Sequence, residues 1–143
     1  MTDAAPRHLL AVDDDSSVLG LLHDIFTDAG YCVTTRPAGP STAEVEQLAP
    51  DLVVINHRLQ GETGLTISQR LAADPLTAHI PAVLCTADYR FVDQVNSDAA
   101  AAGICVVRKP FDLDELLMVV TGALRCHREG TVGGDHSAQL RPA

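Results

Sequence analysis

The chain has 143 residues, 46% hydrophobic and 20% charged, so it is long enough to bury one core and too short to be expected to form two. Its formal charge of −9 opposes binding to nucleic acid, whose phosphates would repel it. No run approaches the ~18 apolar residues of a membrane span and the first residues do not resemble a signal peptide, so we expect a cytoplasmic protein without membrane association.

Short apolar runs alternate with helical patterns along the chain. The first run, residues 8–12, is expected to form a strand, and the helix after it is expected to begin at an N-cap on Ser16 or Ser17 and to end at Gly30. A second strand over residues 31–35 precedes a short helix, which begins after Ser41 and stops at Pro50.

The same alternation continues to residue 125. Further strands are predicted over residues 52–56, 80–85 and 104–108. Further helices are predicted from Leu65 to about Asp74, from about Arg90 to Ala102, and from Asp112 to about Arg125. The predicted organisation is an N-terminal extension over residues 1–7, one domain over residues 8–125 and a flexible, glycine-rich tail over residues 126–143.

Five strand–helix repeats require parallel pairing through right-handed crossovers. The expected fold is therefore α/β, a flavodoxin-like (βα)5 doubly wound sandwich with a five-stranded parallel sheet of order 2-1-3-4-5. In that order, strands 1 and 3 flank a crevice beyond the carboxyl ends of the strands, where such folds place their functional groups.

Polar residues stand where four of the five strands end. They are Asp13, Asp14, Asn56, Thr86 and Lys109, the last of which is the only lysine in the chain. Neighbouring carboxylates repel each other, and a hard cation such as Mg²⁺ relieves that repulsion. A hydroxyl and a compact ammonium are suitable partners for phosphoryl oxygens. The plain alternative is that the acidic run at 13–15 is only a solvated loop.

With Pro110-Phe111 after the lysine, these residues make the chain resemble the receiver domain of two-component response regulators over about residues 8–125. In such domains the residue matching Asn56 is an aspartate that takes phosphate from a histidine kinase. The resemblance implies Mg²⁺ ligands at Asp13, Asp14 and the Arg58 backbone carbonyl, phosphoryl-sensing residues at Thr86 and Lys109, and a switch aromatic at the position of Val106.

The chain departs from this pattern at three positions. An amide is a poor nucleophile compared with a carboxylate, so we expect that Asn56 is not phosphorylated and that no catalytic residue is present. The lost charge and ligand should also leave Mg²⁺ binding weak. Val106 lacks the aromatic ring of the usual switch residue, and Gln60 replaces a proline that is usual in receivers.

The expected function is a non-enzymatic, phosphorylation-independent receiver in two-component signalling. It would act on a protein partner, such as a histidine kinase or another regulator, through about residues 90–125, and a homodimer through that face is a second arrangement. One alternative is an ordinary phosphoaccepting receiver with an engineered Asp-to-Asn change at 56. Another is a small haloacid-dehalogenase-like phosphatase, with Asp13 as nucleophile and Asp15 as acid/base.

The cysteines and histidines show no spacing typical of metal ligands. Three cysteines, at 32, 85 and 105, lie in apolar strand-like runs and are expected to pack in the core. His57 follows the third strand, and strand alternation predicts that it points away from the crevice, which disfavours it as a phosphate acceptor.

Overall fold

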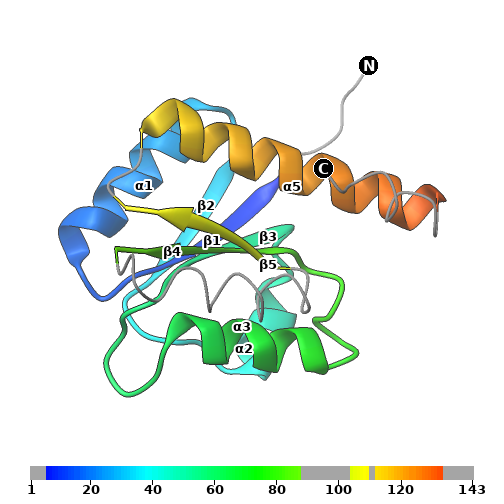
Figure 1. Cartoon of the computed structure of the whole chain (residues 1–143), viewed down its shortest axis with the longest axis horizontal. Helices are drawn as coiled ribbons and strands as arrows, with labels where there is room; N and C mark the ends of the chain where they lie inside the picture. The colour runs from blue at the N-terminus through cyan, green and yellow to red at the C-terminus, as the bar shows by residue number, and fades with distance from the viewer. Residues whose placement is uncertain (1–5, 88–103, 110–111, 134–143) are drawn as a thin grey trace.

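A computed structural model describes residues 6–87, 104–109 and 112–133, with side chains as far as Arg125. The five strands are β1 (His8–Val12), β2 (Cys32–Arg36), β3 (Leu52–Asn56), β4 (Ala82–Thr86) and β5 (Ile104–Arg108). They form one sheet of order β2-β1-β3-β4-β5, in which every neighbouring pair is parallel (Figure 1). The predicted fold and strand order are confirmed, with boundary shifts of one residue in β2 and two or fewer in β4.

Helices cover both faces of the sheet. They are α1 (Ser16–Asp28), α2 (Thr42–Leu48), α3 (Gly64–Ala73) and α5 (Leu113–Gly133). Figure 1 shows α1 and α5 on one face and α2 and α3 on the other, which is the doubly wound arrangement. The helix predicted over residues 90–102 lies outside the described residues.

The prediction for the start of α1 was wrong, because Asp15 caps the helix in place of Ser16 or Ser17. The Asp15 carboxylate accepts hydrogen bonds from the backbone N–H groups of Ser17 at 2.9 Å and Val18 at 3.3 Å. A carboxylate is as good an N-cap as a serine hydroxyl and also carries a charge that the helix dipole favours. The predicted end of the helix is confirmed, since Gly30 adopts the left-handed conformation at φ +99°.

The C-terminal helix is longer than predicted. It was expected to end near Arg125 and to give way to a flexible tail at 126, but α5 continues to Gly133. A single interior glycine such as Gly130 costs a helix only about 1 kcal/mol relative to alanine, so it does not by itself end one. Figure 1 shows this part of α5 projecting past the edge of the sheet.

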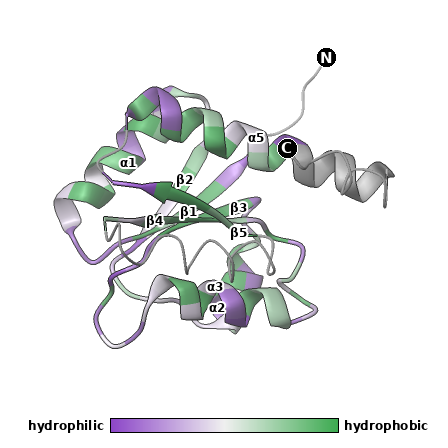
Figure 2. Ribbon diagram, in the orientation of Figure 1, coloured by the Kyte–Doolittle hydropathy of each residue, from purple (hydrophilic) through white to green (hydrophobic). Residues whose placement is uncertain are grey.

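Strand alternation divides the buried residues into two cores, one on each face of the sheet. In β1, Leu9 and Ala11 face the core under α1 and α5, while Leu10 and Val12 face the core under α2 and α3. Figure 2 shows most of the sheet as hydrophobic and the helices as mixed. This pattern is typical of parallel strands covered on both faces.

The cysteines are only partly in the core. Cys85 on the interior strand β4 is buried, as expected, but Cys32 and Cys105 are exposed. They lie on β2 and β5, the two edge strands, where the helices cover the sheet least completely. Within the described residues, no helix is long and apolar enough to cross a bilayer.

Candidate functional site

The carboxyl ends of β3, β4 and β5 enclose a pocket with a volume of about 330 Å³. Among the described residues, those that line it are Asn56, Arg58, Thr86, Ala87 and Lys109. Asn56 and Thr86 are the last residues of their strands, and Lys109 directly follows β5. Parallel pairing therefore brings together three residues that the sequence analysis had singled out at separate strand ends, Asn56, Thr86 and Lys109.

Asn56 is held by the loop that follows it. Its side-chain amide nitrogen, Nδ2, donates a hydrogen bond of 2.7 Å to the backbone carbonyl oxygen of Arg58. The adjacent backbone is fixed to β4, because the His57 N–H donates to the carbonyl of Cys85 at 2.8 Å. The side-chain amide of Asn56 thus contacts the backbone of Arg58, two residues later in the same loop.

The start of α3 closes this loop from the other side. An isolated antiparallel bridge joins Arg58 to Thr63, and the N–H of Gly64 donates to the carbonyl of His57 at 2.8 Å. A Cβ atom on Gly64 would lie 2.3 Å from the carbonyl oxygen of Asn56, so a larger residue there would displace either α3 or the end of β3. Glycine is required at position 64 by this close approach.

Asp13 and Lys109 form an ion pair across the edge of the sheet. The Lys109 Nζ lies 3.5 Å from Oδ2 of Asp13, whose side chain is only 3% exposed. The other carboxylate oxygen, Oδ1, accepts the N–H of Asp15 at 3.0 Å. Lys109 is positioned through its backbone, because its N–H donates to the carbonyl of Thr86 at 2.7 Å. A nearly buried carboxylate therefore has both a cationic and a neutral donor.

Cys85 lies beneath this pair in the core shared by α1 and α5. Burial raises the pKa of its thiol to about 12, with Lys109 opposing the shift and Asp13 adding to it. A thiol with so high a pKa stays protonated at neutral pH, so it acts as a packing group and not as a nucleophile.

Comparison with known proteins agrees with this geometry. The profile of the response regulator receiver domain matches residues 9–121, most of the chain. The chain belongs to the response regulator receiver domain family.

Two curated relatives are longer than this chain. The chain is 32% identical to the protein PetR of Rhodobacter capsulatus over 99% of its own length and 59% of PetR. It is 35% identical to RpaA of Synechocystis, a DNA-binding dual master transcriptional regulator, over 84% of its own length and 49% of RpaA. The chain thus spans roughly half the length of these two relatives.

A solved structure supports the fold directly. A crystal structure from Chloroflexus aurantiacus, assigned to the response regulators, is 30% identical with a TM-score of 0.74. The match covers 84% of this chain and 98% of that protein. Two-component signalling is therefore the setting in which the site must be understood.

The remaining predicted site residues lie around the pocket and not in its wall. Asp14 is exposed on the loop after β1. Val106 is half-buried on β5 and packs against the core under α2 and α3. Neither is among the residues that line the pocket.

Receiver domains typically bind Mg²⁺ at the phosphorylation site, and several oxygens of that site already accept hydrogen bonds in this receiver. The Arg58 carbonyl already accepts the amide of Asn56, and both oxygens of Asp13 have donors. Across the described residues, no group of three or more histidine, cysteine, aspartate or glutamate side chains could hold a metal. A cation bound here would share these oxygens with their hydrogen-bond donors, so its binding should be weak.

Two features of the site were not anticipated from the sequence. The sequence analysis assigned Lys109 to phosphoryl sensing and did not anticipate its ion pair with Asp13. The bond from Asn56 to Arg58 was also missed, although an amide two residues before a carbonyl at a strand end is a pattern in which local side-chain to backbone bonds form.

Proposed function

We propose that this receiver domain signals without phosphorylation, because Asn56 stands where receivers carry the phosphoaccepting aspartate. The observation that carries the proposal is the 2.7 Å hydrogen bond from Asn56 Nδ2 to the Arg58 carbonyl. The amide N–H group of Asn56 carries a partial positive charge and interacts with the carbonyl oxygen that would otherwise coordinate a metal ion. The Arg58 carbonyl oxygen therefore has a hydrogen-bond partner without a metal ion and without a phosphoryl group.

The chemistry of an amide supports this proposal. Aspartyl phosphate forms when a carboxylate oxygen attacks phosphorus, and the lone pairs of a neutral amide are much weaker nucleophiles. Loss of one carboxylate also removes a charged ligand, so Mg²⁺ should bind only weakly through Asp13, Asp14 and the Arg58 carbonyl. Thr86 and Lys109 remain at the positions that sense a phosphoryl group in other receivers.

The output must then pass through a protein partner in the cytoplasm. We place the contact with a histidine kinase or another regulator within about residues 90–125, of which the structure describes 104–109 and 112–125, with a second copy of the chain as the other arrangement. The described part of this region includes Met118 on α5, whose side chain is 72% exposed. A large exposed apolar side chain of this kind is more common at interaction surfaces than elsewhere. The switch position on β5 holds Val106, which has no polar tip to exchange between two environments.

The structure bears on only one of the two alternatives, the haloacid-dehalogenase-like phosphatase. An engineered Asp-to-Asn change at 56 would concern the origin of the residue, and the chemistry of the present chain would be the same. A haloacid-dehalogenase-like phosphatase would need Asp13 as nucleophile and Asp15 as acid/base. Asp13 instead contacts Lys109, and Asp15 caps α1 with its carboxylate. This arrangement favours the non-enzymatic receiver.

A small phosphodonor tests the proposal. After incubation with acetyl phosphate and Mg²⁺, the intact mass of the wild-type chain should be unchanged, because no carboxylate is present at position 56. The Asn56→Asp variant treated in parallel should gain one phosphoryl group. An acid-stable or base-labile phosphoryl adduct on the wild type, mapped to residues 50–60, would contradict the proposal.

A further inference from the structure

Asn56 differs from the aspartate of other receivers by one amide group, and water can remove such a group without an enzyme. The backbone nitrogen of the next residue loses its proton and attacks the side-chain carbonyl carbon, Cγ. A cyclic imide, the succinimide, forms as the bond from Cγ to Nδ2 breaks and ammonia leaves. Water then opens the ring at either carbonyl, which gives aspartate or isoaspartate. At this position the attacking nitrogen belongs to His57.

The backbone nitrogen of His57 is held in the sheet. Its N–H donates a hydrogen bond of 2.8 Å to the carbonyl oxygen of Cys85. Asn56 and Cys85 are partners in the register of β3 and β4, and Cys85 is buried, so this bond belongs to the interior of the ladder. A proton held in such a bond reaches solvent only when the backbone opens locally. The nucleophile of the succinimide route is therefore blocked in the closed sheet.

The amide of Asn56 is held as well. Its Nδ2 donates a hydrogen bond of 2.7 Å to the carbonyl oxygen of Arg58. Ring closure requires Cγ to come within bonding distance of the His57 nitrogen, which rotates the backbone of Asn56 out of the extended conformation of β3. That movement would break the bond to Arg58 and draw His57 away from β4.

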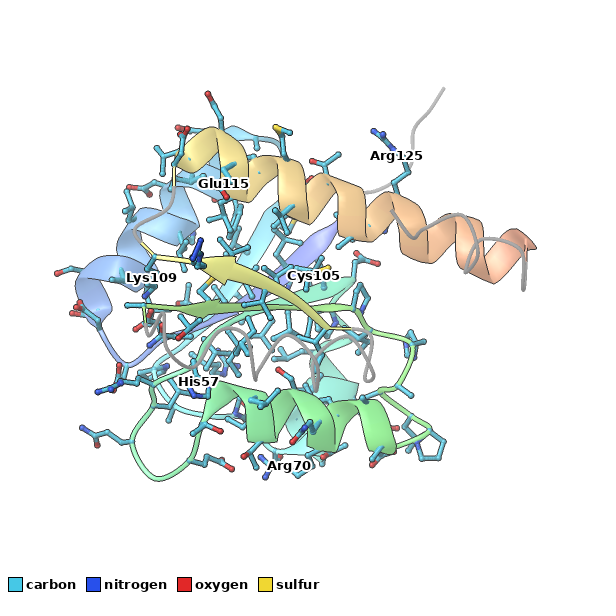
Figure 3. All side chains as sticks on the ribbon, in the orientation of Figure 1. His57, Arg70, Cys105, Lys109, Glu115 and Arg125 are labelled. Carbon is cyan, nitrogen blue, oxygen red and sulfur yellow. The ribbon has the colours of Figure 1, made fainter. Side chains whose placement is uncertain are left out.

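The start of α3 holds the same peptide group from its other side, because the N–H of Gly64 donates to the carbonyl of His57 at 2.8 Å. Figure 3 shows His57 on the side of the sheet that α2 and α3 cover. Three hydrogen bonds must therefore break before the ring can form. Each contributes about fivefold to the equilibrium between the closed and open backbone, or about 100-fold together.

We propose that Asn56 is a deamidation site that the native fold keeps closed and that local opening of the junction between β3 and α3 exposes. While the junction is closed, the amide persists. When it opens, the succinimide route converts residue 56 to aspartate or isoaspartate. The aspartate supplies the carboxylate whose absence prevents phosphorylation. This consequence rests on the proposed function, whereas the conversion itself does not.

The test follows the conversion of the folded and the unfolded chain by peptide mass spectrometry. Both samples are incubated in EDTA at mildly alkaline pH, one in buffer and one in guanidinium chloride, in water enriched in ¹⁸O that labels each converted residue. Asn96 is the only other asparagine in the chain, and its conversion in denaturant is the internal standard. Asn56 is expected to convert about 100-fold more slowly in buffer than in denaturant. The product should contain both aspartate and isoaspartate.

A pair of glycine variants tests the junction itself. Gly64→Ala should convert about tenfold faster than wild type in buffer, because its Cβ would lie 2.3 Å from the carbonyl oxygen of Asn56 and the junction must loosen. Gly20→Ala on α1 is the matched control, since no described group outside its own stretch of helix lies within 4 Å of the added Cβ. Its rate should stay within about twofold of wild type.

Circular dichroism establishes that both glycine variants are folded. Should Gly64→Ala not fold, the conversion of wild type is measured at guanidinium concentrations below the unfolding transition. The rate should then rise before global unfolding begins, because the junction opens locally. A rate that rises only with global unfolding would count against the proposal.

The proposal is overturned if Asn56 converts as fast in buffer as in denaturant, or if it stays intact in denaturant while Asn96 converts. It is also overturned if folded Gly64→Ala matches Gly20→Ala. A product of aspartate alone would mean that water attacks the amide directly, which contradicts the succinimide route.

The proposed function is tested separately, because no phosphodonor is present during the conversion. Converted chains are afterwards treated with acetyl phosphate and Mg²⁺, and the fraction with aspartate at position 56 should gain a phosphoryl group. If that fraction gains none, the account of why the unconverted chain is not phosphorylated is wrong, while the deamidation result stands.

Discussion

Replacing Asn56 with aspartate is expected to lower the melting temperature of the metal-free protein and to make it dependent on Mg²⁺. In the variant, a carboxylate oxygen takes the place of the amide nitrogen that lies 2.7 Å from the Arg58 carbonyl. Two acceptor oxygens then face each other without a hydrogen between them, and a further negative charge is placed near Asp13. The free energy of unfolding should fall by about 1.4 kcal/mol for each unit by which this repulsion raises a carboxyl pKa.

Magnesium should reverse the loss in the variant, because the third carboxylate completes a set of oxygen ligands. Ligand at one hundred times its Kd stabilises a folded protein by about 2.7 kcal/mol, which is several degrees for a chain of this size. Thermal scans of wild type and variant, with and without Mg²⁺, measure both effects. The wild type serves as the control and should respond little to the ion. Identical melting temperatures under all four conditions would mean that the acidic run is a solvated loop.

Removing the cation from the Asp13–Lys109 pair should produce the largest loss of stability. Lys109→Met leaves the carboxylate of Asp13, which is only 3% exposed, without its positive partner. Breaking a fully buried ion pair from one side typically costs about 3–5 kcal/mol, because the remaining charge is not solvated, and we expect a loss toward the lower end of that range because this pair is only part-buried. Chemical denaturation with urea measures this change in the free energy of unfolding.

A double-mutant cycle shows whether the pair itself is responsible. Asp13→Asn removes the stranded charge, so the double variant Asp13→Asn, Lys109→Met should be more stable than Lys109→Met alone. Arg125→Met removes a cation from an exposed position and should change stability by no more than about 0.5 kcal/mol. If Lys109→Met destabilises the protein no more than this control does, the ion pair does not contribute to the free energy of unfolding.

The fold could be predicted from the sequence because its signals are local and periodic. Continuous apolar runs, each followed by a helical pattern, indicate a parallel sheet and the edge at which polar residues gather, and the order 2-1-3-4-5 follows from the flavodoxin-like fold. Asn56, Thr86 and Lys109 could be brought to one edge in this way, since parallel strands all end on the same side of the sheet. That argument needs no side-chain geometry.

The features that the sequence could not predict are contacts for which several residues are chemically suitable and the tertiary structure selects one. Asp15, Ser16 and Ser17 are all suitable N-cap residues. The path of the backbone after β1 determines that the helix begins at Ser16 and that Asp15 is its N-cap. The ion pair between Lys109 and Asp13 joins residues 96 positions apart, so it depends on how the ends of β1 and β5 are placed and not on the local sequence. Exposure of Cys32 and Cys105 likewise depends on which strands are at the edges of the sheet, not on their own apolar neighbours.

Phosphotransfer from a histidine kinase tests the central claim most directly. A kinase that has autophosphorylated with labelled ATP is mixed with the wild-type chain and, separately, with Asn56→Asp in Mg²⁺. The account predicts that label moves to the variant and that none moves to the wild type, because only the variant has a carboxylate at the end of β3. Label on the wild-type chain, mapped to Asn56 or to another residue of the pocket, would contradict it.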